Sequence, residues 1–179
     1  TEERWFPMST SVRKRFGGVV LPVSELVARS QAQPEPDWAE VYGTELGNDA
    51  ADAAAECHRL IGLGEPLLAC WRYGVLQAVD YYDSARRRGG LGLAAQVFGR
   101  EPAPTGAAEV DAAFAALAEH LAVRDGWTTP KWAMSLGRTA SAPWYVVDVP
   151  AYRAIVEQEA PPAFRQRGGF ISAHGLDRA

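Results

Sequence analysis

Residues that could bind a metal ion or act as nucleophiles are few in this chain. They comprise three histidines and two cysteines: His58, His120, His174, Cys57 and Cys70. Glu56, Cys57 and His58 are consecutive, but adjacent residues of a helix point in different directions and cannot close around one ion. No C-x-x-C spacing occurs either. We therefore predict no metal site and no cofactor.

Motifs for covalent catalysis or phosphate binding are equally scarce. No serine lies in a G-x-S-x-G turn. Gly62 and Gly64 precede a predicted helix, but Glu65 repels a phosphate and Pro66 has no N–H to offer one. With no recognisable catalytic constellation, we expect a non-enzymatic protein. An enzyme with an unrecognised site is the third hypothesis, and its candidate residues are Arg72, Tyr73, Asp80 and His58.

Two other groups of residues suit contact with a partner. The first is acidic: Asp49, Asp52 and Glu56 share one face of a predicted helix that Asn48–Asp49 can cap. They could attract a basic partner or a cation, or form a solvated face that complements the helix dipole. The second group is aromatic and basic, and it lies in the last third of the chain: Trp132, Trp144, Tyr145, Phe164, Arg165 and Arg167. Such residues are enriched at interface centres, but large aromatics also pin chain ends to a core.

Basic clusters support a second hypothesis, in which the protein binds nucleic acid. The clusters are Arg13, Lys14 and Arg15 near the start, and Arg86, Arg87 and Arg88 at the end of a long predicted helix. The net charge of −4 argues against a dedicated nucleic-acid binder, since affinity for phosphates depends on positive charge. No aromatic residue follows the second cluster closely enough in the sequence to stack on bases, so we favour cations that complement a helix C-terminus.

Composition indicates a folded protein of ordinary type. The 179 residues are 47% hydrophobic and 22% charged. No run reaches the roughly 18 apolar residues that span a bilayer, and the first six residues lack the apolar core of a signal peptide. We expect a cytoplasmic protein. Cys57 and Cys70 are then reduced core thiols, with a disulfide between neighbouring helices as the alternative.

The pattern of apolar residues predicts a mostly α fold. We expect a helical bundle around a long central helix at about 65–88, which Pro66 opens and Gly89 and Gly90 close. Gly74 costs about 1 kcal/mol relative to alanine in mid-helix, so another backbone should approach it closely. The proline-rich stretch 99–106 predicts a boundary. It would separate an N-terminal helical subdomain with an irregular arm, 1–100, from an aromatic-rich helical subdomain, 105–179, holding at most a short strand pair.

Four segments carry a resemblance to a known group of proteins: 110–121, 127–132, 144–147 and 161–171. Together they resemble a module of small actinobacterial proteins associated with predicted antitoxins and helix-turn-helix regulators. The resemblance implies a non-enzymatic role in binding a cognate protein, such as a toxin encoded by a neighbouring gene. The alanine-rich, lysine-poor composition fits a high-GC bacterium. Our first hypothesis is accordingly the antitoxin of a toxin–antitoxin pair.

Overall fold

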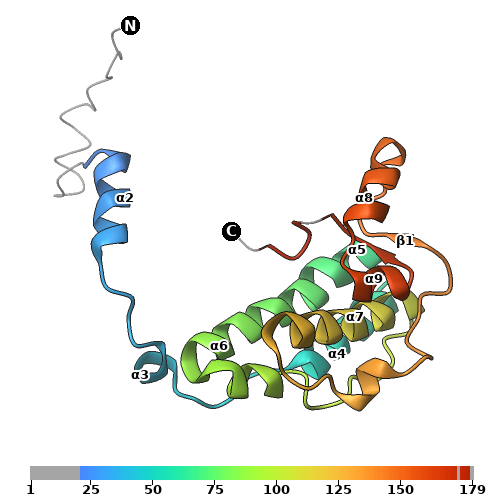
Figure 1. The fold of residues 1–179 in the computed structure, drawn as a ribbon, viewed down its shortest axis with the longest axis horizontal. Helices are drawn as coiled ribbons and strands as arrows, with labels where there is room; N and C mark the ends of the chain where they lie inside the picture. The colour runs from blue at the N-terminus through green and yellow to red at the C-terminus, as the bar shows by residue number, and fades with distance from the viewer. Residues whose placement is uncertain (1–20, 173, 178–179) are drawn as a thin grey trace, which may run out of the picture. The chain divides into compact units, whose positions relative to one another are not determined.

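Helices make up most of the part of the chain that the structure describes, which is residues 21–172 and 174–177 of a computed structural model. Its first elements are α2 (Val23–Ala32), α3 (Trp38–Tyr42), α4 (Ala50–Gly62), α5 (Leu67–Cys70), the π-helical turn η1 (Trp71–Val75) and α6 (Leu76–Gln96). They are followed by α7 (Ala108–Asp125), η2 (Lys131–Met134), β1 (Trp144–Tyr145), η3 (Pro150–Tyr152), α8 (Arg153–Glu159), α9 (Pro162–Gln166) and β2 (Gly169–Phe170) (Figure 1). The predicted mostly α fold is confirmed.

Contacts along the chain define two units, Thr1–Pro36 and Asp37–Ala179. Helix α2 lies in the first unit and buries none of its own residues. All the other elements belong to the second unit, and the core described below is therefore the core of that unit.

Helix α4 begins at a capping box. The Asp49 carboxylate accepts hydrogen bonds from the backbone N–H groups of Ala51 and Asp52, at 2.8 and 3.0 Å, and the Asp52 carboxylate accepts one from the Asp49 N–H at 3.0 Å. These bonds satisfy N–H groups that the first turn of a helix leaves without intrahelical partners. The predicted helix start at Asn48–Asp49 is therefore correct.

The long central helix is present, and it consists of α5, η1 and α6 in succession. Its regular part ends where predicted, because Gly89 and Gly90 have non-helical backbone angles and Gly90 has a φ of 65°. The π-helical turn at Trp71–Val75 was not predicted. It contains Gly74, where an added Cβ would lie 2.0 Å from the Cys57 Sγ atom of α4. The nearest neighbour is thus a side-chain atom, and the backbone that approaches Gly74 is that of α4, whose Ala53 carbonyl oxygen would lie 3.4 Å from the added Cβ.

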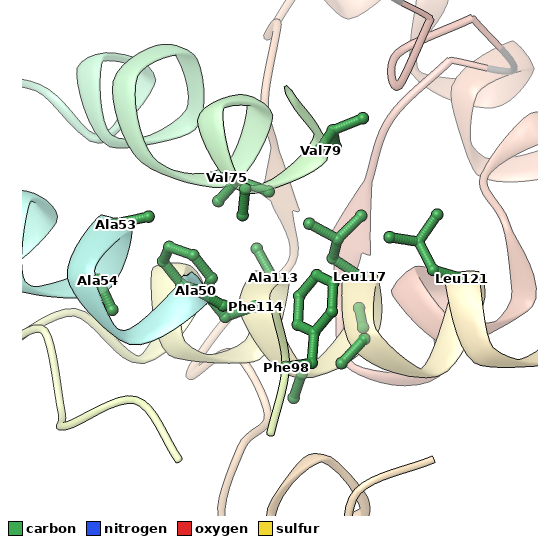
Figure 2. Packing of buried hydrophobic residues seen from close by; sticks show 14 of the residues in the cluster. Ala50, Ala53, Ala54, Val75, Val79, Phe98, Ala113, Phe114, Leu117 and Leu121 are labelled. Atoms are coloured by element: carbon green, nitrogen blue, oxygen red, sulfur yellow. The ribbon is translucent and has the colours of Figure 1, made fainter. Parts of the chain in front are cut away.

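Helix α7 lies at the centre of the core. Ten of its residues are buried, and Phe114 and Leu117 have no exposed surface. Figure 2 shows how side chains of α4, the central helix and α7 meet around Phe114 and Phe98. One cluster of buried apolar residues continues from Ala50 to Ile171, and so it includes residues on both sides of segment 99–106.

A short pair of parallel strands ties the C-terminal segments together. Trp144 of β1 pairs with Gly169 of β2, and Tyr145 pairs with Phe170, which gives the short strand pair expected in this region. Between the strands the chain forms η3, α8 and α9. Helix α9 packs on α7 and buries Phe164, whereas α8 packs mainly on η3 and buries none of its residues.

Candidate functional site

Half of the predicted aromatic and basic group lies inside the protein. Trp132 and Phe164 are 8% and 1% exposed, and the Trp132 indole N–H donates to the Phe98 carbonyl oxygen at 3.0 Å. Arg167 is 9% exposed and donates to the Glu119 carboxylate at 2.5 Å. Because a buried guanidinium needs such partners, these three residues hold the C-terminal segments to α7 and offer a partner little surface.

The other members of this group lie nearer the surface. Trp144 is partly buried and meets Trp71 edge to face, with 6.1 Å between ring centroids. The Tyr145 ring stacks on Phe170 at 5.0 Å, and its hydroxyl donates to the carboxylate of Glu157 in α8. This hydrogen bond to a carboxylate raises the pKa of Tyr145. Arg165 is exposed.

Beside Tyr145 lies a set of exposed apolar side chains that we call the C-terminal apolar patch. Its members and their exposed fractions are Val147 at 68%, Val149 at 40%, Tyr152 at 59% and Ile155 at 49%. A soluble protein usually scatters its exposed apolar residues, whereas these four come from a stretch of nine residues around η3 and α8. Sequence reasoning named Trp144 and Tyr145 but missed this stretch. The sequence feature that could have revealed this stretch is a series of apolar residues around Pro150, at positions that no regular helix or strand would bury.

Polar contacts fix the backbone that carries the C-terminal apolar patch. The Arg153 guanidinium forms two hydrogen bonds of 2.7 Å with the Asp148 carboxylate and lies 4.8 Å from the centroid of the Tyr145 ring. With the hydrogen bond between Tyr145 and Glu157, these contacts connect β1, the loop before η3, and α8. The patch is therefore held in place before any partner binds.

An apolar groove adjoins the patch. It has a volume of about 90 Å³, and most of its lining is apolar: Trp71, Val146, Val147, Val156, Phe170 and Ile171. Val147 belongs to both the groove and the patch, so the two adjoin at this residue. The groove has room for one or two apolar side chains and offers few groups for catalysis.

The predicted acidic group is neutralised within the chain. Arg100 donates to both carboxylate oxygens of Asp49, at 2.8 and 2.7 Å, and to Asp52 at 2.5 Å. Partial burial raises the pKa of Asp49, but the Arg100 and backbone hydrogen bonds outweigh it and leave the pKa below its ordinary value. Glu56 is paired with Arg59 at 2.6 Å. The three carboxylates cap and brace α4, and little free charge is left to attract a basic partner.

Only the second of the two basic clusters lies within the described residues. Arg13, Lys14 and Arg15 lie outside the described residues. In the second cluster each arginine has a different partner. Arg86 forms an ion pair with Asp125 at 3.4 Å, and Arg87 lies over the Trp38 ring, 5.7 Å from its centroid. Arg88 donates to the carbonyl oxygens of Gly43 and Glu45, at 3.1 and 2.8 Å. These partners lie 39 to 49 positions away along the sequence, so sequence inspection could not find them.

Groups that could support catalysis are dispersed. Among the described residues, no three or more histidine, cysteine or acidic side chains lie close enough to hold a metal ion. Cys57 and Cys70 are free and buried, and burial raises the pKa of both thiols. Of the residues named for an unrecognised enzyme site, His58, Arg72 and Tyr73 are exposed. Within the same part of the chain, no helix is long and apolar enough to cross a bilayer.

Comparison with known proteins yields no relative: no protein-family model, curated protein or solved structure matches this chain. Its function must accordingly be inferred from its own surfaces.

Proposed function

We propose that this protein is a non-enzymatic protein-binding module that receives its partner on the C-terminal apolar patch and the adjoining groove. The supporting observation is that α8 buries none of its residues while Tyr152 and Ile155, just before and within it, are 59% and 49% exposed. A helix this short gains most of its stability from packing. One that leaves apolar side chains in water is well suited to pack against another protein.

The layout of this surface resembles the general plan of protein interfaces, in which an apolar centre is surrounded by polar groups. The groove supplies a preformed pocket for an anchor side chain, and the exposed patch supplies the apolar area around it. Asp148, Arg153 and Glu157 supply the polar rim. Because the rim contacts already fix the backbone, binding requires little ordering of this segment, and a smaller entropic cost favours affinity.

The chemistry of the surface also describes the partner. The groove is small and mostly apolar, so it suits a leucine, isoleucine or phenylalanine side chain projecting from the partner's surface. The resemblance of the four segments 110–121, 127–132, 144–147 and 161–171 to modules of predicted antitoxins makes the product of a neighbouring gene, a toxin in that case, the first partner to test.

The test is to mix the purified protein with the product of its neighbouring gene and to measure complex formation by size-exclusion chromatography and calorimetry. Tyr152→Ala and Ile155→Ser should each weaken the complex about tenfold, since truncating a central interface residue costs roughly 1–2 kcal/mol. Leu136→Ser is the matched control, because Leu136 is 92% exposed and belongs to neither the patch nor the groove. Circular dichroism verifies that each variant is folded.

Two outcomes would contradict the proposal. One is the absence of a complex when both proteins are folded. The other is a complex whose affinity falls equally, or not at all, in the patch variants and in the Leu136 control. If the complex forms and the partner arrests growth when expressed alone, rescue by the wild type but not by Tyr152→Ala would support the antitoxin role.

A further inference from the structure

A second concave surface, independent of the proposed protein-binding site, lies between α3, the loop that follows it, and α6. It consists of two adjoining cavities of about 430 and 230 Å³ that share Tyr42, Ser84 and Arg88 in their linings. We call it the α3–α6 cleft. Its size falls within the usual range of small-molecule sites, and its lining differs from that of the apolar groove in carrying charged side chains.

One arginine holds the wall of this cleft in place. Arg88, which directly precedes the break at Gly89 in α6, donates to the carbonyl oxygens of Gly43 and Glu45, at 3.1 and 2.8 Å, and thereby fixes the loop after α3. A guanidinium is a planar fork of donors that can hold several acceptors at once. These acceptors are carbonyl oxygens, and among the described residues no carboxylate forms an ion pair with Arg88, so its positive charge is not neutralised there by a direct partner.

A second arginine supplies further positive charge. Arg87 lies over the Trp38 ring, 5.7 Å from its centroid, and has no carboxylate within ion-pair distance in the described part of the chain. Glu45 is the one acidic residue of the two linings, against Arg87 and Arg88. In a chain with a net charge of −4, the cleft is therefore locally cationic.

Aromatic rings provide the remaining recognition surface. Trp38 and Tyr42, one turn apart on α3, stack with 5.8 Å between centroids and 13° between planes. Tyr42 is 65% exposed, so it presents ring surface to a ligand. Tyr81 of α6 also lines the cleft. A planar ring can stack against such surfaces, while Asn48 and Ser84 offer an amide and a hydroxyl to its polar edge.

We propose that the α3–α6 cleft binds a small anionic ligand that carries a planar aromatic ring. Tyr42 stacks on the ring, and Arg87 pairs with the anionic group while its own guanidinium rests on Trp38. Either a nucleotide phosphate or an aromatic carboxylate has this chemistry. Arginine accommodates both, because its N–H groups match the spacing of two oxygen atoms.

The test measures binding of AMP, UMP and indole-3-acetate to the full chain by calorimetry and by amide chemical shifts. The nucleotides represent the phosphate source and indole-3-acetate the carboxylate source. We expect one of them to bind with a Kd below about 1 mM. For the phosphate source, adenosine or uridine alone and inorganic phosphate alone should bind at least tenfold more weakly, since each lacks half of the recognised chemistry.

Variants assign the binding to the cleft. Arg87→Ala and Tyr42→Ala should each lower the affinity for the ligand about tenfold, in keeping with the contribution of one aromatic stack. Arg165→Ala is the matched control, because Arg165 is an exposed arginine that lines neither cavity. Shift changes in the wild-type protein must also centre on Tyr42 and Ser84, which keeps the test decisive if a variant fails to fold.

The proposal is overturned if none of the three probes binds at several millimolar. It is also overturned if adenosine binds as tightly as AMP, or if a folded Arg87→Ala variant keeps the wild-type affinity. Binding of long oligonucleotides without binding of the mononucleotides would point to a nucleic-acid surface instead and would likewise reject it.

Discussion

Replacing Gly74 with alanine tests how closely the π-helical turn η1 packs against α4. In an ordinary helix this change stabilises the fold by about 0.5–1 kcal/mol, because glycine loses more backbone entropy on folding. At Gly74 the added Cβ would lie 2.0 Å from the Cys57 Sγ atom, with the Ala53 carbonyl oxygen at 3.4 Å and the Phe114 ring at 3.6 Å. Carbon and sulfur cannot approach so closely, so the helices must separate or the cysteine must change rotamer.

We expect a net loss of stability. Overpacking a dense core costs typically about 1–3 kcal/mol, which exceeds the helix-propensity gain. The Cys57 thiol has no exposed surface and points at the Cys70 carbonyl oxygen at 3.5 Å, so rotating it away gives up an existing contact. The variant should unfold with a midpoint lowered by up to about 10 °C, because the net loss is at most about 2.5 kcal/mol and each kcal/mol lowers the midpoint by roughly 2–4 °C in a chain of this size.

The measurement is thermal and urea unfolding followed by circular dichroism. Gly92→Ala is the matched control, since an added Cβ there meets no atom within 4 Å, and it should be neutral or stabilising. Cys57→Ala removes the sulfur atom that clashes. The double variant Cys57→Ala/Gly74→Ala should therefore be more stable than the two single effects predict, by about 1 kcal/mol or more. A stabilised Gly74→Ala variant, or strictly additive effects, would refute the reasoning.

Three further predictions follow from contacts described above. Arg88→Ala should release the loop after α3 and so speed hydrogen exchange of the loop's backbone amides. Arg59→Ala, which breaks an exposed ion pair, should leave the exchange of those amides unchanged. Equal exchange rates in the two variants would be contrary evidence. Cys57 and Cys70 should resist iodoacetamide at pH 8 in the native protein and react in denaturant, because burial shields both thiols and raises their pKa values; rapid native labelling would show that the core opens. The pKa of Asp49 is lower in the folded protein than in the unfolded chain, so its charge stabilises the fold above the unfolded value, about 3.9. That contribution is lost as the pH falls through the folded pKa, and urea unfolding of Asp49→Asn should accordingly show a smaller loss of stability than the wild type between pH 5 and pH 3.

Local signals in the sequence were sufficient to predict where the main helices begin and end. Asp49 predicted the start of α4, and Gly89 and Gly90 predicted the end of the regular central helix, because capping and left-handed glycines depend on nearest neighbours. Gly74 predicted a close approach, since a mid-helix glycine costs stability unless packing requires it. The short helix α3 and the π-helical turn were missed. The first is only five residues long, so its apolar spacing at Trp38, Val41 and Tyr42 covers a single turn, and the second has no local signal in the sequence.

The candidate sites depend on contacts between residues that are far apart in the sequence. Such contacts could not be predicted from the sequence alone. Arg167 and Arg165 are two positions apart and similar in type, yet Arg167 is buried against Glu119 and Arg165 is exposed. Nothing local distinguishes them. In the same way, the sequence gives no sign that the Arg87 guanidinium lies over the Trp38 ring, because the two residues are far apart along the chain.

The strand pair gives the segment that carries the C-terminal apolar patch an unusual freedom to vary. Val146 and Ala160 are 8% and 2% exposed, whereas none of residues 147–159 between them is buried. The pairing of β1 with β2, together with α9, secures the chain on both sides of this excursion. Doubling the length of such a loop costs only about 0.6 kcal/mol in closure entropy. The segment can therefore be lengthened, shortened or replaced while the core stays the same, so that one scaffold can acquire new binding specificities through thirteen consecutive positions.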